Sequence, residues 1–125
     1  MMLNPFWLWI AAAASLACWA IHTFVGGRQI VPPLRASDLP GMPKHVLVFV
    51  WHIVTILLFV MTAGYALAAL YPQAWMLAVQ ATVLNAAIAV LIMGVSVRFR
   101  MPFRDMPQWT LFLAIAVFGG LAMWL

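Results

Sequence analysis

The charged side chains of this chain are confined to two short windows. All eight acidic and basic residues lie within Arg28–Lys44 and Arg98–Asp105, and the rest of the 125-residue sequence is almost continuously apolar. Charged residues make up 6% of the chain, whereas soluble domains carry about 25%. A soluble fold of this size could not cover so much apolar surface with polar groups, so lipid must serve as the solvent. The sequence therefore predicts an integral membrane protein.

The apolar sequence divides into four segments of the length that crosses a bilayer. A helix needs about 20 mostly apolar residues to span the hydrocarbon layer. The pattern predicts an all-α bundle of four transmembrane helices, with one domain over residues 1–125 and helices at about 5–26, 43–70, 73–97 and 107–124. Gly26 and Gly27 are expected to cap the first helix, because glycine readily adopts the left-handed conformation that follows a helix C-terminus.

The basic residues fall on one side of the predicted bundle. With four helices, the segments after the first and third helices share a side, and they hold all six lysines and arginines. Cytoplasmic segments carry the excess of basic residues in membrane proteins. We therefore expect an inner-membrane protein with both chain ends in the periplasm. Membrane lipids with anionic headgroups are the expected partners, and nucleic acid is not, because the basic residues lie close to the membrane and no nucleic-acid motif accompanies them.

The third predicted helix carries two features that bear on packing. A line of mostly small residues recurs at every fourth position from Ala74 to Gly94, and such lines allow close contact between helices in lipid. The line either packs inside the bundle or forms a seam between copies in a homo-oligomer, and both interpretations stay open. The amides Gln80 and Asn85 are expected to bond neighbouring helices of the bundle.

Three histidines gather in the half of the bundle that holds the basic residues. His22 lies about one turn before the end of the first predicted helix. His45 begins the second helix, and His52 follows seven residues later on the same face. Ionisable residues inside a membrane are rare and mark functional sites. We expect a cytoplasmic-side pocket of histidine and arginine, and its candidate ligand-binding residues are His22, Arg28, His45, His52, Thr55, Arg98 and Arg100.

Four interpretations of this cluster are open. The histidines can be structural, each bonding a neighbouring helix. They can join the arginines in binding an anionic headgroup or a small anion. His22 and His52 can ligate haem or a transition metal, because imidazole suits iron, zinc and copper. A histidine can also take part in proton-coupled transport.

Several classes of enzyme are excluded by what the sequence lacks. The chain contains no glutamate, and both aspartates lie in predicted loops, so paired carboxylate chemistry inside the membrane is not available. No zinc-protease helix motif, P-loop, nucleophile elbow or cysteine pair occurs. We expect a non-catalytic accessory or binding subunit, in a homo-oligomer or in a larger membrane complex. The alternatives are a haem- or metal-binding redox helper and a small oligomeric transporter.

Two short motifs flank the basic segment. Residues 22–28 read H-T-F-V-G-G-R, and residues 51–55 read W-H-I-V-T. Together they resemble the H-T-x-x-G-G-R and W-H-x-x-T motifs of a group of small uncharacterised bacterial four-helix membrane proteins. The resemblance covers residues 22–55. It implies the same four-helix fold and implies that His22, His52 and the segment between them form one unit, but it implies no activity.

Overall fold

The computed structural model describes the whole chain, residues 1–125. It consists of α1 (Pro5–Ala20), η1 (Ile21–Gly26), α2 (Gly27–Ala36), α3 (Gly41–Leu70), η2 (Pro72–Ala74), α4 (Trp75–Arg98) and α5 (Gln108–Trp124). Because α1, η1 and α2 are continuous, and η2 leads directly into α4, the chain forms four helices without strands, as predicted. The first three are long and apolar enough to cross a membrane, whereas α5 is apolar but has 17 residues.

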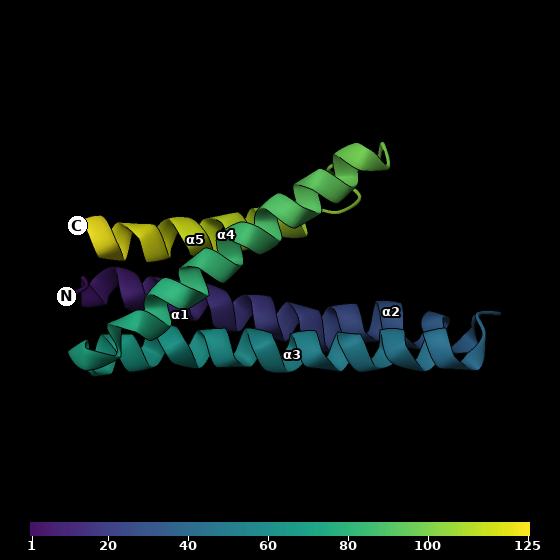
Figure 1. Cartoon of the computed structure of the whole chain (residues 1–125), viewed down its shortest axis with the longest axis horizontal. Helices are drawn as coiled ribbons and strands as arrows, with labels where there is room; N and C mark the ends of the chain where they lie inside the picture. The colour runs from purple at the N-terminus through teal and green to yellow at the C-terminus, as the bar shows by residue number, and fades with distance from the viewer.

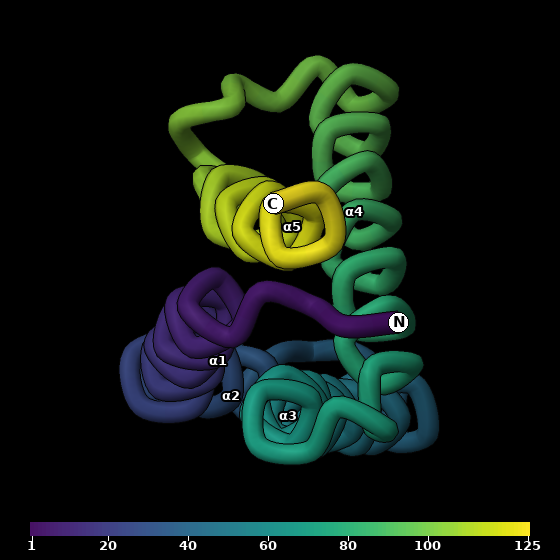
Figure 2. The backbone as a smooth tube through the Cα atoms, turned by 90° about the vertical axis from the view of Figure 1, so that its left-hand side faces the viewer, coloured from purple at the N-terminus to yellow at the C-terminus, as the bar shows by residue number.

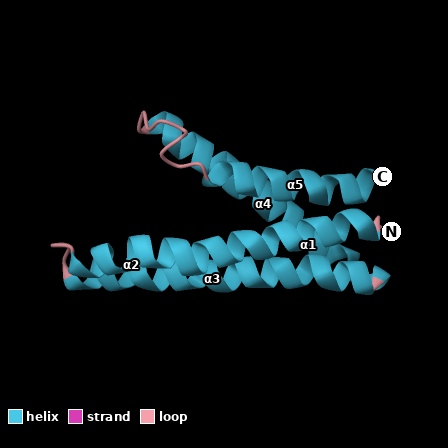
Figure 3. Ribbon diagram, turned by 180° about the vertical axis from the view of Figure 1, so that it is seen from behind, coloured by secondary structure: helices cyan, strands magenta, loops and turns pink.

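The four helices form a bundle that is closed at one end, where they pack as a ring, and open at the other end, where they separate. α1 packs between α3 and α5, and α4 completes the ring by packing against α3 and α5 (Figure 2). The two chain ends meet at the closed end, where the Asn4 backbone N–H donates to the Ala122 carbonyl at 2.9 Å. At the other end α4 and α5 diverge from α3, so α2 and the beginning of α3 project as a helical hairpin (Figures 1 and 3).

Small side chains and short polar links hold the ring together. Thr62 on α3 donates to Ser15 on α1 at 2.9 Å, and Tyr65 on α3 bonds Thr82 on α4 at 3.0 Å. These links matter in an apolar bundle because apolar contact alone does not drive helices together in lipid. The buried interior combines small residues with a few large ones, namely Ala11, Ala78, Ala81, Ala89, Leu8, Leu58, Tyr65 and Ile115.

The first helix does not end at Gly26, and the prediction of a glycine cap is wrong. Gly26 (φ −62°, ψ −40°) and Gly27 (φ −57°, ψ −40°) are both right-handed helical, whereas a glycine cap is left-handed. The Gly27 N–H bonds the His22 carbonyl, five residues back, so the helix widens into a π-helical turn and continues to Ala36. Arg28 and Arg35 therefore lie on a helix, and only residues 37–40 form the connection to α3.

The two amides of α4 have different environments. Asn85 is fully buried, where its Nδ2 donates to the Ala81 carbonyl at 2.8 Å and contacts Met61 Sδ on α3 at 3.6 Å. It therefore links two helices, as expected. Gln80 is exposed and makes no hydrogen bond within the chain, so the prediction that it bonds a neighbouring helix of the bundle is wrong. The line of small residues also leaves the interior, because Ala78 is buried while Gly94 is exposed.

Candidate ligand-binding site

A groove opens between the first helix and α3 near the base of the projecting hairpin. Its volume is about 270 Å³. We call it the hairpin groove; it is lined by Thr23, Phe24, Gly27, Arg28 and Val31 on η1 and α2, and by Trp51, His52 and Thr55 on α3. His52 lies seven residues before Phe59, whose ring packs against Trp19 of α1. Because residues seven apart share a helix face, the groove lies on the side of α3 where α1 packs, not where α4 packs.

His22 fixes the two walls of the groove to each other. Its ring stacks on the Trp51 ring, with centroids 4.1 Å apart and planes 15° from parallel. Its Nε2 lies 3.0 Å from Thr55 Oγ1 and 3.3 Å from the Trp51 carbonyl oxygen. Thr55 Oγ1 donates its own proton to that carbonyl at 3.1 Å. Because both neighbours of Nε2 then act as acceptors, the imidazole proton belongs on Nε2.

The π-helical turn and Gly26 make this contact close. A Cβ on Gly26 would lie 3.1 Å from the Trp51 ring, which is closer than a methyl group normally packs against carbon. The extra residue of the π-turn also rotates the helix after it, so that Gly27 and Arg28 continue the wall that Thr23 begins. The two motifs of the sequence thus meet face to face, H-T-x-x-G-G-R on one wall and W-H-x-x-T on the other.

The groove carries positive charge and an exposed imidazole. The only ion pair in the chain joins Arg104 Nε to Asp105 Oδ1 at 3.8 Å, so no carboxylate neutralises Arg28. Thr23 Oγ1 has no hydrogen-bond partner in the chain, but it is buried and not open to the groove. His52 is exposed and adds an imidazole to the same cavity. A guanidinium and an imidazole around one small cavity suit an anion with several oxygen atoms.

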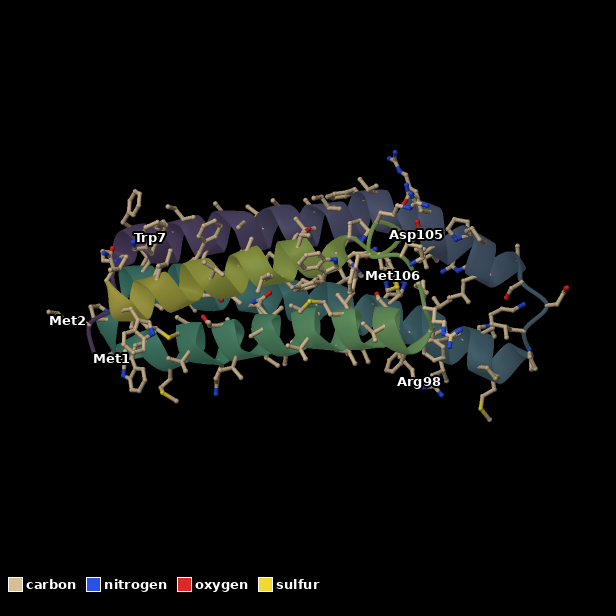
Figure 4. All side chains as sticks on the ribbon, turned by 90° about the horizontal axis from the view of Figure 1, so that it is seen from above. Met1, Met2, Trp7, Arg98, Asp105 and Met106 are labelled. Carbon is tan, nitrogen blue, oxygen red and sulfur yellow. The ribbon has the colours of Figure 1, made fainter.

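Four of the predicted site residues do not line this groove: His22, which bonds Thr55 beside it, and His45, Arg98 and Arg100. His45 is exposed near the beginning of α3, about two turns before His52. Arg98 ends α4, where its guanidinium lies 5.6 Å from the centre of the Phe99 ring, and Arg100 follows with φ 53°. Arg98 lies at the end of the bundle opposite Met1 (Figure 4), but α4 diverges from the helical hairpin and carries its last residues away from α2 (Figure 1).

No metal cluster surrounds the histidines. His22 commits Nε2 to α3 through Thr55 and Trp51, which leaves Nδ1 as its only free ligand atom. Nowhere in the chain do three His, Cys, Asp or Glu side chains come together. Cys18 is buried in the bundle. The interpretation of His22 and His52 as metal ligands stays a prediction to which the geometry adds no support.

Sequence reasoning placed His22, Arg28, His52 and Thr55 correctly in one region but missed part of the groove. Thr23 gave no signal, because a threonine in an apolar helix usually bonds the carbonyl four residues back. Trp51 is part of the W-H-x-x-T motif, but its stacking on His22 depends on the π-helical turn. No protein family, curated protein or solved structure matches this chain, so the functional proposal depends on the geometry.

Proposed function

We propose that this chain is an integral membrane protein that crosses the bilayer four times and binds an anionic lipid headgroup in the hairpin groove. The three long helices have the length and hydropathy required for crossing. The 17 residues of α5 span about 25 Å, which is slightly less than the hydrocarbon thickness of about 30 Å. Residues 99–107 connect α5 to α4 across the remaining depth.

The depth of the groove supports a headgroup as its ligand. The closed end of the bundle, where the chain ends meet, is taken as one surface of the hydrocarbon layer. About 20 helical residues then span the layer. Counted forward from Pro5, these residues end at Phe24; counted back from Leu70, they end at Trp51. Both counts end at residues of the groove. The remainder of α2 and the beginning of α3 then project beyond the hydrocarbon, where the charged residues lie.

The charge distribution supports a cytoplasmic position for this end. The basic residues lie on α2, at the beginning of α3, at the end of α4 or in the connection from α4 to α5. Figure 4 shows Arg98 at the end opposite Met1 and Met2. By the positive-inside rule this end faces the cytoplasm and the chain ends face the periplasm. The protein then sits in an inner membrane, where it acts as a small binding or accessory subunit.

The single observation that carries the proposal is the meeting of Arg28 and His52 in one cavity at headgroup depth. A phosphate in this cavity can accept a charged hydrogen bond from Arg28 while its acyl chains stay in lipid. Phe24 and Val31 supply apolar contact beside these donors. The exposed apolar face of α3 next to His52 gives an acyl chain a surface to follow.

Replacing Arg28 with glutamine is expected to weaken the binding of phosphatidylglycerol about 5- to 10-fold, because the charged hydrogen bond and the local attraction of the headgroup are both lost. Titration of the purified protein with phosphatidylglycerol, followed by native mass spectrometry, measures this loss. The matched control is Arg35→Gln, which removes the same charge from the same helix outside the groove. Equal weakening by both substitutions would mean that general charge, and not the groove, attracts the lipid.

A further inference from the structure

The helical hairpin of α2 and the beginning of α3 projects from the bundle (Figure 1). Phe24 and Trp51 are placed at the hydrocarbon boundary, as proposed above. At a rise of about 1.5 Å per residue, α2 then ends about 18 Å outside this boundary and α3 begins about 15 Å outside it. A tilt of about 20° shortens these heights by less than about a tenth. Because phospholipid headgroups occupy only about 5–8 Å on each side of the hydrocarbon, the outer half of the hairpin stands above them.

Arg35 and His45 repeat the basic pair of the hairpin groove further from the membrane. Arg35 follows Arg28 by seven residues on α2, and His45 precedes His52 by seven residues on α3. Seven residues are about two helical turns, so each residue lies on the same helix face as its counterpart, about 10 Å further out. Both side chains are exposed, as are those of the groove pair. We call Arg35 and His45 the outer pair.

The antiparallel register of the hairpin brings the outer pair together. Nε2 of His22 lies 3.0 Å from Thr55 Oγ1, so these two residues lie level with each other. Counted from this contact along both helices, His45 lies about three residues, or about 5 Å, closer to the membrane than Arg35. Side chains on a helix lean toward its N-terminus, so Arg35 leans toward the membrane and His45 leans away from it. The two side chains therefore converge, as those of the groove pair do.

The outer pair is free to bind an anion. Asp38, in the connection between α2 and α3, is the only acidic residue of the hairpin. The only ion pair in the chain joins Arg104 to Asp105, so Asp38 does not neutralise the outer pair. A guanidinium binds phosphate oxygens through paired charged hydrogen bonds, and an imidazole adds a further donor. Because the outer pair stands above the headgroup layer, a phosphate linked directly to the lipid glycerol does not reach it.

We propose that the hairpin binds a phospholipid whose headgroup carries a second phosphate. The phosphate that links the headgroup to the acyl chains occupies the hairpin groove, beside Arg28 and His52. The headgroup then extends along the hairpin, away from the membrane, and its second phosphate contacts Arg35 and His45. This inference rests on the headgroup binding proposed above, and it names the class of headgroup that the site prefers.

Two inositol lipids that differ only in the second phosphate test this preference. Purified protein is titrated with phosphatidylinositol 4-phosphate or with phosphatidylinositol, and binding is measured by native mass spectrometry. The phosphorylated lipid should bind about 5- to 10-fold more tightly, because it gains charged hydrogen bonds at the outer pair. Arg35→Gln or His45→Gln should reduce this preference to about twofold or less without changing the binding of phosphatidylinositol. The matched control is Arg98→Gln, which removes one charge from the end of α4 and should keep the preference.

Equal binding of the two inositol lipids by the wild-type protein would overturn the proposal. A preference that Arg98→Gln reduces as much as Arg35→Gln would also overturn it, because general charge would then explain the difference. Soluble inositol 1,4-bisphosphate has both phosphates but no acyl chains, so it should bind at least about tenfold more weakly than the lipid. Equally tight binding of this soluble compound would show that the ligand is not a lipid. The effect of Arg28→Gln on phosphatidylglycerol tests the groove separately, since that lipid has a single phosphate.

Discussion

Replacing Gly119 with alanine is expected to destabilise the whole bundle by about 2–4 kcal/mol, because the new methyl group enters a filled and hydrogen-bonded site. The Cβ would overlap Thr82 Oγ1 and would lie 2.9 Å from the Tyr65 hydroxyl. Neither neighbour can move freely. Thr82 Oγ1 bonds the Ala78 carbonyl at 2.8 Å and Tyr65 at 3.0 Å, and the Tyr65 side chain is fully buried. Either α5 separates from α4, or the bond between α3 and α4 breaks.

Gly120→Ala is the matched control, since a Cβ at that position meets nothing within 4 Å. Unfolding of each variant in mixed micelles with increasing denaturing detergent, monitored by circular dichroism, gives the free energies of unfolding. Gly120→Ala should unfold like the wild type. If Gly119→Ala were as stable as the wild type, the contact of α5 with Tyr65 and Thr82 would be wrong.

Replacing Gly26 with valine is expected to separate the walls of the hairpin groove and to lower the free energy of unfolding by about 1–3 kcal/mol. Even a methyl group at Gly26 would lie 3.1 Å from the Trp51 ring. That ring cannot easily turn away, because it stacks on His22, whose Nε2 is bonded to Thr55. The larger side chain therefore pushes η1 away from α3 and breaks the bonds of His22.

The neighbouring Gly27 supplies the comparison. A Cβ there meets only the His22 carbonyl, at 3.9 Å, so Gly27→Val should fold with nearly wild-type stability. Detergent unfolding of both variants measures the difference. Equal losses of stability would show that any side chain in this turn is harmful and that the contact between Gly26 and Trp51 has no special importance.

The helices and the basic end of the bundle could be predicted because they depend on composition along the chain. Apolar segments near the length of a membrane span, separated by charged or proline-containing turns, define the four helices. The course of the chain after Gly26 could not be predicted, because a glycine pair before a basic segment resembles a helix end in water. Tertiary contacts that residue spacing does not reveal hold this turn against α3: His22 stacks on the Trp51 ring, and Gly26 approaches the same ring closely.

The candidate site was predictable in part for a similar reason. Helical spacing places His52 and Thr55, three residues apart, on the same face of one helix, and the order of the helices brings His22 near them. Arg98 and Arg100 belong to the same end of the bundle, but the divergence of α4 from α3 depends on tertiary packing, which spacing does not reveal. The exposure of Gln80 depends in the same way on how α4 is rotated against α3.

The side of the membrane that the basic end faces can be measured by labelling single cysteines. In a Cys18→Ala background, single cysteines replace Met2 at the closed end or Leu39 between α2 and α3, and intact cells are treated with a membrane-impermeant maleimide. We predict that Met2→Cys is labelled in intact cells and that Leu39→Cys is labelled only after the inner membrane is permeabilised, because the basic hairpin is cytoplasmic. Labelling of Leu39→Cys in intact cells, with Met2→Cys protected, would contradict a groove on the cytoplasmic surface.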